Sequence, residues 1–471
     1  MLVHTLVMAA RSSNVCDVRA APWNARGDNT TDDTLAIQMA IDACHAAHPL
    51  GAIVRLSGPH TMYKLSASIA LTSNLTLQVD ANAGLFSSVT PASFNRTNRT
   101  QNARCPVSYW ADGPTAVLCG TNLTNVAIVG QHINTSVLDG GGWPWYGTPY
   151  GPQTSLHGPR LFEVAWSKNV TLSHVTFQFS GGWTIHPQFT DGVLAEHIRI
   201  LNPRWQGNTD GFDPDSCTNV VLRDSIIDTG DDGISIKSGN SSVPGSEHVQ
   251  MPTDGVHIYR TKILSRNFCL GSATYGGIFN VLMEDCEIGD DRGSSPWAFK
   301  YKSHQGYAGA LINHTYRRIQ VGKIAPNAYQ QVRSSFLLFA LFFVAHIFTL
   351  YSFVSPQPHA GYFISIELRY HPLIPNRTCS VNYAARSGDC PIFSNVTFED
   401  ISIAGAARAG DINGFKGDLL RGLTFRNVTF ATPPAVGWSC GYVDVATFAA
   451  SGMAALPLKC SAGPAESSVR V

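Results

Sequence analysis

Short runs of apolar and β-branched residues recur along most of the chain, and each run opens on asparagine or glycine. Within a run apolar and polar residues alternate, which is typical of a strand that buries one face. Asparagine and glycine tolerate the left-handed backbone that a tight corner requires. Such short strands bury a face only by stacking, so the repeat predicts an all-β parallel solenoid. The runs begin at Asn74, Asn125, Asn169, Gly192, Asn219, Gly255, Asn280, Asn395 and Gly422.

One segment near the start of the chain has a helical period instead. Asp32 and Asp33 precede it as candidate capping residues. Ile37, Ile41 and Cys44 then recur on one face of the predicted helix. We expect this helix to cover the N-terminal end of the solenoid core.

The repeat is interrupted by one long apolar stretch, residues 332–357 (VRSSFLLFALFFVAHIFTLYSFVSPQ). Its centre is about as long as a membrane span. A membrane helix would split the solenoid between two coils, and an exposed apolar loop of this size would aggregate. We therefore interpret the stretch as a retained intron, whose removal would join Gln331 to Pro358. The rest of 16–471 is predicted to be a single solenoid domain, because such domains run long.

The charge balance excludes some partners. The 471 residues hold 33 Lys and Arg and 33 Asp and Glu, a formal net charge of zero. A nucleic-acid partner is not indicated, and attraction for an acidic polymer would have to be local.

Several features indicate the secretory pathway. The chain has eleven cysteines, an odd number that leaves at least one thiol unpaired, and Cys286 is the candidate because it lies in an apolar strand pattern. Residues 1–15 are too short for a complete signal peptide and are interpreted as a remnant of one or a misassigned start. We expect a secreted, extracellular monomer without a membrane anchor. Twelve Asn-x-Ser/Thr sequons support this: Asn29, Asn74, Asn95, Asn98, Asn122, Asn134, Asn169, Asn240, Asn313, Asn376, Asn395 and Asn427.

Two acidic motifs stand one coil apart. Asp210 lies in NTDGFD (208–213), and Asp231 with Asp232 lies in GDDGISIKSG (230–239). A separation of 21 to 22 residues is close to one solenoid turn, so the three carboxyl groups should meet on one face of neighbouring coils. Their mutual repulsion should raise the pKa of at least one of them. A protonated acid beside an ionised base is the pair that glycoside hydrolysis uses.

These two motifs resemble the signature of glycoside hydrolase family 28, the polygalacturonases and rhamnogalacturonases. The resemblance extends from about Cys16 to the final cysteines. Within the family, the chain resembles an exo-type, fungal-like member. Further matching motifs, in the family's order, are Gly27-Asp28, Thr31-Asp32-Asp33-Thr34, Leu138-Asp139-Gly140-Gly141-Gly142, Arg160-Leu161-Phe162 and Trp183-Thr184-Ile185-His186.

The resemblance implies a right-handed parallel β-helix of the pectin-lyase-like type and an inverting hydrolase of α-galacturonosyl linkages in pectin. It implies that Asp231 is the general acid, that Asp210 and Asp232 hold and deprotonate the water, and that no metal or cofactor takes part. Proximity and the resemblance together favour three disulfides: Cys16–Cys44, Cys379–Cys390 and Cys440–Cys460.

The candidate substrate-binding residues come partly from the resemblance and partly from positions where this chain differs from the family's motifs. Asn208 would order a carboxylate or a sugar hydroxyl, and Lys237 could reach a uronate carboxylate or be a paired lysine. Where the family carries Gly-His-Gly, this chain has Ser265-Arg266-Asn267, and Arg266 could supply a carboxylate-binding fork or lie on the surface. The family's Arg-Ile-Lys is present as Lys300-Tyr301-Lys302, so Lys302 matches while Lys300 replaces an arginine.

The motifs leave open whether the polymer is attacked at its end or in its interior, and which pectic polymer is cleaved. Exo-acting members carry an insertion where this chain has residues 240–253, which favours an exopolygalacturonase. Alternatives in the same family are a rhamnogalacturonan or xylogalacturonan hydrolase. Outside it, a pectate lyase would share the fold but use calcium and an arginine base. A non-catalytic pectin-binding protein would need only aromatic platforms such as Trp143, Trp145 and Trp205.

Overall fold

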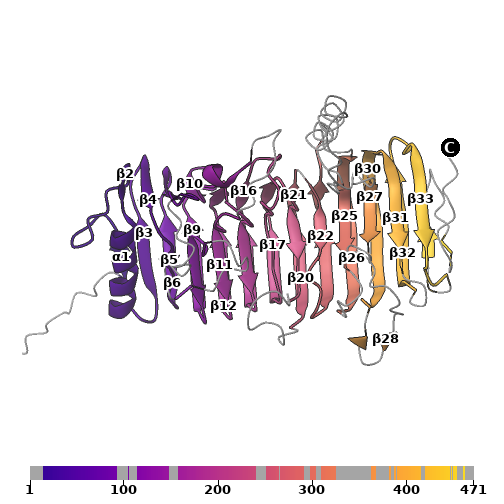
Figure 1. Ribbon diagram of the computed structural model, residues 1–471, viewed down its shortest axis with the longest axis horizontal. Coiled ribbons are helices and arrows are strands. Elements are labelled where there is room, and N and C mark those ends of the chain that lie inside the picture. The colour runs from indigo at the N-terminus through magenta and orange to yellow at the C-terminus, as the bar shows by residue number, and fades with distance from the viewer. Residues whose placement is uncertain are drawn as a thin grey trace, which may run out of the picture.

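The chain forms one long stack of coils that runs from the N-terminal helix to the C-terminal strands (Figure 1). Strands of successive coils pair in parallel, so the predicted parallel β-helix is confirmed. The computed structural model describes residues 14–92, 104–105, 114–147, 157–239, 251–264, 266–290, 297–303, 309–324, 362–367, 381–382, 387–388, 390–414, 419–445, 447, 449–452 and 460–461.

Three ladders of parallel strands make the walls of the solenoid. The first ladder contains β1 (Val15–Asp17), β3 (Ala52–Leu56), β6 (Leu75–Val79), β9 (Thr124–Gly130), β12 (Lys168–Ser173), β15 (Asp191–Glu196), β17 (Thr218–Arg223), β20 (Thr253–Tyr259), β23 (Ile278–Glu284), β26 (Leu311–Ile324), β30 (Phe393–Ala406), β32 (Arg421–Phe430) and β34 (Ala449–Ser451). The second ladder contains β2 (Asp28–Asp32), β4 (Thr61–Leu65), β7 (Ala83–Ser87), β10 (Ser136–Asp139), β13 (Thr176–Gln178), β16 (Arg199–Leu201), β18 (Ile226–Asp228), β21 (Lys262–Ile263) and β24 (Glu287–Ile288), and it ends on β26.

The third ladder is divided into two blocks. Before the division lie β5 (Ile69–Ala70), β8 (Leu118–Thr121), β11 (Phe162–Ala165) and β14 (Ile185–Gln188). After it lie β19 (Ile234–Ile236), β22 (Phe268–Leu270), β25 (Trp297–Lys302), β27 (Tyr362–Glu367), β31 (Arg408–Asn413) and β33 (Val436–Gly441). Phe212 and Asp215 join the blocks only through isolated bridges to residues of β14 and of the β19 coil. A short antiparallel pair, β28 (Val381–Asn382) with β29 (Ser387–Gly388), stands apart from the coils.

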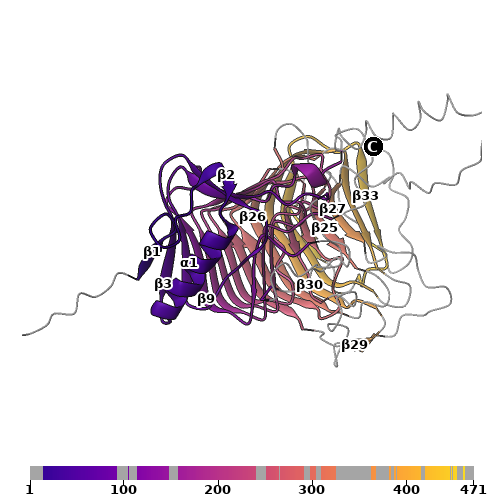
Figure 2. The same ribbon diagram turned by 60° about the vertical axis from the view of Figure 1, so that its left-hand side comes forward.

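The predicted helix is present as α1 (Thr34–Ala47), at the N-terminal end of the solenoid (Figure 2). Its buried residues are Ile37, Ala40, Ile41 and Cys44, which confirms the predicted inward face. The predicted capping is only partly right. Asp33 occupies the N-cap position but makes no side-chain cap, since its carboxylate accepts hydrogen bonds from the backbone of residues 26 and 27, whereas Asp32 accepts one from the backbone N–H of Thr34.

The predicted asparagine corners have left-handed backbone, and their side chains form an asparagine ladder that was not predicted. The side-chain amides donate from coil to coil, for example from Asn125 to Asn74 at 2.8 Å and from Asn313 to Asn280 at 3.1 Å. Its members all have left-handed backbone, with φ between 53° and 64°. We define the asparagine ladder as Asn74, Asn125, Asn169, Asn219, Asn280, Asn313 and Asn395.

The disulfides agree in part with the prediction. The expected Cys16–Cys44 and Cys440–Cys460 pairs form, and a pair that was not expected joins Cys105 to Cys119. Cys379 lies outside the described residues, so its predicted pairing with the disulfide-bonded Cys390 is not tested. The thiol of Cys286 is free as predicted. Two further buried thiols among the described residues, Cys217 and Cys269, are free as well.

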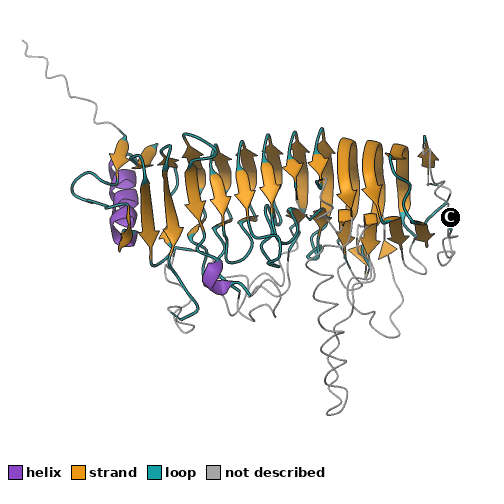
Figure 3. Cartoon of the chain, turned by 90° about the horizontal axis from the view of Figure 1, so that it is seen from above, coloured by secondary structure: helices purple, strands orange, loops and turns teal. Residues whose placement is uncertain are grey.

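Loops gather on one side of the solenoid, where the short 3-10 helix η1 (Trp143–Trp145) also lies (Figure 3). Residues 1–13, the insert 332–357 and most of the insert 240–253 are outside the described part of the chain. Within the part that is described, we find no helix with the length and apolar character of a membrane span.

Candidate active site

The two acidic motifs meet where the third ladder is divided. The backbone N–H of Gly211 donates to the carbonyl of Asp232 at 3.0 Å, which fixes the coil of Asp210 directly beside the coil of Asp232. Asp210 and Asp232 are buried, whereas Asp231 is half-buried. The sequence therefore predicted correctly that these three residues lie on neighbouring coils.

Asp231 is held by the backbone on either side. Its Oδ2 accepts a hydrogen bond from the N–H of Asn208 at 2.9 Å, and its Oδ1 accepts one from the N–H of Asp232 at 3.0 Å. A Cβ at Gly230 would lie 1.9 Å from the carbonyl oxygen of Gln206, so only glycine lets the chain approach this closely. The side chain of Asn208 is itself exposed, at a residue with left-handed backbone.

Asp232 is surrounded by donors. Lys302 Nζ lies 2.6 Å from Oδ2, and the Asn267 amide donates to Oδ1 at 3.0 Å. Burial alone would raise the pKa of Asp232, but the positive charges of Lys302 and Lys237 outweigh it and lower that pKa to about 2. Asp232 is therefore ionised across the ordinary pH range.

Asp210 has the opposite electrostatics. Burial raises its pKa well above the usual range, and the negative charges of Asp213 and Asp231 add to the rise, while Lys237 opposes it. Burial raises the pKa of Asp213 too, again against Lys237. The raised carboxyl pKa that repulsion predicted is thus found at Asp210. We call Asp210, Asp213, Asp231 and Asp232 the acid cluster.

Lys237 is buried among the acids. Its Nζ lies 3.0 Å from Asp213 Oδ2 and 3.6 Å from Asp210 Oδ2, and it donates to Ser235 Oγ at 2.6 Å. The Trp183 ring lies over it, with the centroid 4.4 Å from Nζ. Lys237 is therefore paired in the structure, and its contact with a uronate carboxylate stays a prediction.

Arg266 and Lys300 are both buried near this face. Arg266 has left-handed backbone, and its Nε makes no hydrogen bond. Lys300 Nζ lies 3.7 Å from the centroid of the Trp297 ring. A surface position for Arg266 is therefore excluded.

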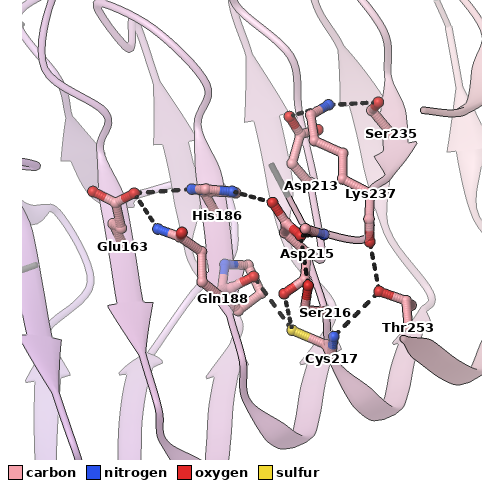
Figure 4. Close-up of polar contacts among 12 residues, drawn as sticks. Glu163, His186, Gln188, Asp213, Asp215, Ser216, Cys217, Ser235, Lys237 and Thr253 are labelled. Atoms are coloured by element: carbon pink, nitrogen blue, oxygen red, sulfur yellow. Dashed lines mark hydrogen bonds and ion pairs between the residues drawn. The ribbon is translucent and has the colours of Figure 1, made fainter. Parts of the chain in front are cut away.

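Sequence reasoning missed a buried polar network on the outward face of the third ladder (Figure 4). His186 lies between two carboxylates, with Nδ1 2.9 Å from Glu163 Oε1 and Nε2 3.7 Å from Asp215 Oδ2. Gln188 donates to the same Glu163 oxygen at 2.7 Å, and Arg160 also pairs with it. Burial would raise the pKa of Glu163, but Arg160 and His186 lower it. The alternation Asp213-x-Asp215 one coil before Ser235-x-Lys237 is a signal that could have located part of this face.

Aromatic residues form a rim on the N-terminal side of the acids. Trp143 is 55% exposed, and its ring centroid lies 6.4 Å from that of Trp205. Trp145 is not part of any platform, because it is buried and donates Nε1–H to the carbonyl of Val89.

Comparison with known proteins gives a consistent result. A family model described as "Glycosyl hydrolases family 28" matches residues 60–329, more than half of the chain. A probable polygalacturonase of Vitis vinifera is 30% identical over 60% of this chain and 57% of its own length. A polygalacturonase of Ralstonia nicotianae is 28% identical over 62% of this chain and 60% of its own. The match therefore spans less than two thirds of either relative.

Solved structures agree on the fold. An exopolygalacturonase from Thermotoga maritima superimposes with a TM-score of 0.67 at 17% identity, over 97% of this chain and 94% of the other. A polygalacturonase from Erwinia carotovora gives 0.61 at 21% identity, over 88% and 94%. The similar proteins come from plants, bacteria and a fungus, Cochliobolus carbonum, so the predicted fungal-like origin is not favoured over others.

Proposed function

The chain belongs to the glycosyl hydrolases of family 28, and on this premise we propose that it hydrolyses galacturonosyl linkages of pectin with inversion at the anomeric carbon. The curated relatives named polygalacturonases support this substrate. The observation that carries the proposal is the geometry of the acid cluster, in which the half-buried Asp231 adjoins Asp232 and both lie on the coil next to that of Asp210. Lys302 and Lys237 lower the pKa of Asp232 to about 2, so that an ionised carboxylate lies beside two other carboxyl groups, an arrangement that can divide acid and base work.

We assign the roles by position. Asp231, the most exposed of the three, donates its proton to the leaving glycosidic oxygen. Asp232, held ionised by Lys302, takes a proton from the attacking water. Asp210 orients that water together with Asp232. After one turnover Asp231 has lost a proton and Asp232 has gained one, and exchange with solvent restores both.

Attack from the chain end is the finer part of the proposal. On the coils before the acid cluster, the outward side chains of Glu163, His186 and Gln188 are buried. Trp183 covers this region, with Arg160 Cζ 4.8 Å from its ring centroid. A polymer would then be stopped on that side rather than pass through. The insertion at 240–253 supports the same proposal.

A second candidate, a rhamnogalacturonan hydrolase, is favoured by one observation. Lys300 stands where the family has an arginine, and a neutral rhamnose would offer no carboxylate for an arginine to grip.

Extracellular action is proposed on separate grounds. The three disulfides among the described residues and the twelve sequons support an oxidising, secretory route.

Product analysis tests the proposal. Protein lacking residues 332–357 would be incubated with polygalacturonate, rhamnogalacturonan and xylogalacturonan. We expect monomer or dimer release from polygalacturonate with little early loss of viscosity. Mid-length oligomers with a rapid fall in viscosity would show endo-action, and cleavage of only one other polymer would select the corresponding alternative. No hydrolysis of any polymer, despite binding, would leave a non-catalytic pectin-binding protein.

A further inference from the structure

Arg266 is a charged residue whose position has no internal explanation. It is 8% exposed, and its Nε is buried without a hydrogen bond. No acidic side chain among the residues that the structure describes forms an ion pair with it. A guanidinium stays charged at every accessible pH, so burial without a counter-charge is costly.

The coil register places Arg266 beside the catalytic acids. Ile234 of β19 is level with Phe268 of β22. Asp232 and Arg266 each lie two residues before this pair, so they are level with each other as well. The backbone supports this count, because the N–H of Gly233 donates to the carbonyl of Asn267 at 2.9 Å. Arg266 therefore lies one coil after Asp232, at the same position of the turn.

Asp232 is not the missing partner. Its oxygens accept from Lys302 Nζ and from the Asn267 amide, and no ion pair joins it to Arg266 among the described residues. The guanidinium of Arg266 is thus available to a ligand. A planar fork of N–H donors matches a carboxylate, and a carboxylate would supply the absent negative charge.

Lys300 is a poorer candidate for the same task. Its Nζ lies over the Trp297 ring, and an ammonium group binds a carboxylate as a point charge only. We propose that Arg266 determines specificity by binding the carboxylate of the galacturonate that adjoins the scissile bond. This inference rests on the proposed function and names the residue that distinguishes a free uronate from its ester.

Binding measurements separate this role from a structural one. In the Asp231→Asn background, which slows turnover, the affinities for trigalacturonate and for its fully methyl-esterified form would be measured by calorimetry. We expect Arg266→Gln to weaken trigalacturonate binding roughly 10- to 100-fold, the usual effect of losing a charged hydrogen-bonding partner. Binding of the ester should change less than about two-fold, since esterification already removes the charge that Arg266 would contact.

Two further variants sharpen the test. Arg266→Lys keeps the charge without the fork and should lie between the parent and Arg266→Gln. Arg260→Gln is the matched control, because Arg260 belongs to the same coil but pairs with Asp224 on the exposed outer side. It should bind both trimers as the parent does.

The outcomes are distinct. The inference is overturned if the parent does not bind trigalacturonate, or if Arg266→Gln loses both trimers equally or neither. These results leave the proposed function standing so long as the unsubstituted protein hydrolyses polygalacturonate. Failure of that protein to hydrolyse any pectic polymer would overturn the proposed function itself, whatever the trimers do.

Discussion

The asparagine ladder and the acid cluster are both stacks of polar side chains on consecutive coils, yet they differ in what stacking costs. An amide is both donor and acceptor, so an asparagine can donate to the residue on the coil before it, as Asn169 does to Asn125 at 3.0 Å, while Asn219 and Asn280 donate to Asp191 and Asp254. A carboxylate only accepts, so stacked acids repel unless cations or protons separate them. The fold repeats the first arrangement along the solenoid, whereas it builds the second around Lys237 and Lys302.

Stability and activity are therefore expected to depend on different parts of the solenoid. Repeated coil positions carry groups that satisfy one another, and they define the solenoid. The coil pair of the acid cluster departs from this rule, since it contains buried carboxyl groups with divergent pKa values. Substitutions in the two regions should therefore affect different measurements.

The largest expected effect is on catalysis. Asp231→Asn removes the proposed proton donor but keeps the shape of the side chain, and its amide oxygen can still accept one of the two backbone hydrogen bonds. We expect kcat to fall about 100- to 10,000-fold, with KM and thermal stability close to those of the parent. Initial rates and thermal melts measure this. A near-normal kcat would show that another residue is the general acid. Substitutions in the acid cluster and in the asparagine ladder would then not differ in their effect on kcat as expected.

Next is the cation that holds the acids together. Lys237→Met leaves Asp210 and Asp213 buried without their counter-charge, which should destabilise the protein by about 3–5 kcal/mol in denaturant unfolding. The control is Lys262→Met, whose side chain is half exposed and pairs with Glu287. That variant should change the free energy of unfolding by less than about 1 kcal/mol. If both variants lost the same free energy of unfolding, the ion pairs of Lys237 would not be what stabilises the buried carboxyl groups.

A smaller effect is expected in the asparagine ladder. Asn280→Ala loses the hydrogen bonds to Asp254 and from Asn313 and strains a left-handed backbone, for a cost of about 1–2 kcal/mol. Asn280→Gly relieves the backbone and should recover part of it. Unfolding curves give both values, and kcat should stay at the level of the parent. A fall in kcat would mean that the ladder does more than hold coils in register.

The smallest expected effect is a gain, rather than a loss, in the free energy of unfolding. Because the folded pKa of Asp210 lies above its ordinary value of 3.8, the folded protein holds this proton more firmly than the unfolded chain. Stability from this group therefore falls as pH rises from near 4 through the folded pKa. Asp210→Asn cannot titrate, so it should gain stability on the order of 1 kcal/mol at neutral pH, a gain that shrinks toward pH 4. Melting curves against pH measure the gap, and activity should be lost.

The repeating part of the molecule could be predicted from the sequence because the same pattern of corner and strand residues recurs from coil to coil. Asparagine corners, alternating strands and the spacing between Asp210 and Asp231 all follow from one period. The helix face at Ile37 and Ile41 was equally evident, since local periodicity determines it.

The parts that escaped prediction depend on what covers a strand. Glu163 and His186 point outward on the third ladder and would ordinarily be exposed, yet both are buried. Alternation identifies the outward face but not the loops that close over it. The same limit applies to Lys237, whose paired state depends on Asp213 and Trp183. The Cys105–Cys119 pair was missed because its first cysteine has no strand pattern around it.

The helix α1 has a consequence for molecules beyond the single chain. A stack of parallel strands has no inherent length, since the last strand always presents unpaired N–H and C=O groups that could template another. A helix keeps its backbone hydrogen bonds to itself, so it cannot extend a sheet. By burying Ile37, Ala40, Ile41 and Cys44 against the first coil, α1 closes that end to further strands. The same few residues that complete the core thus act as a terminator, and at this end they oppose head-to-tail polymerisation into fibrils.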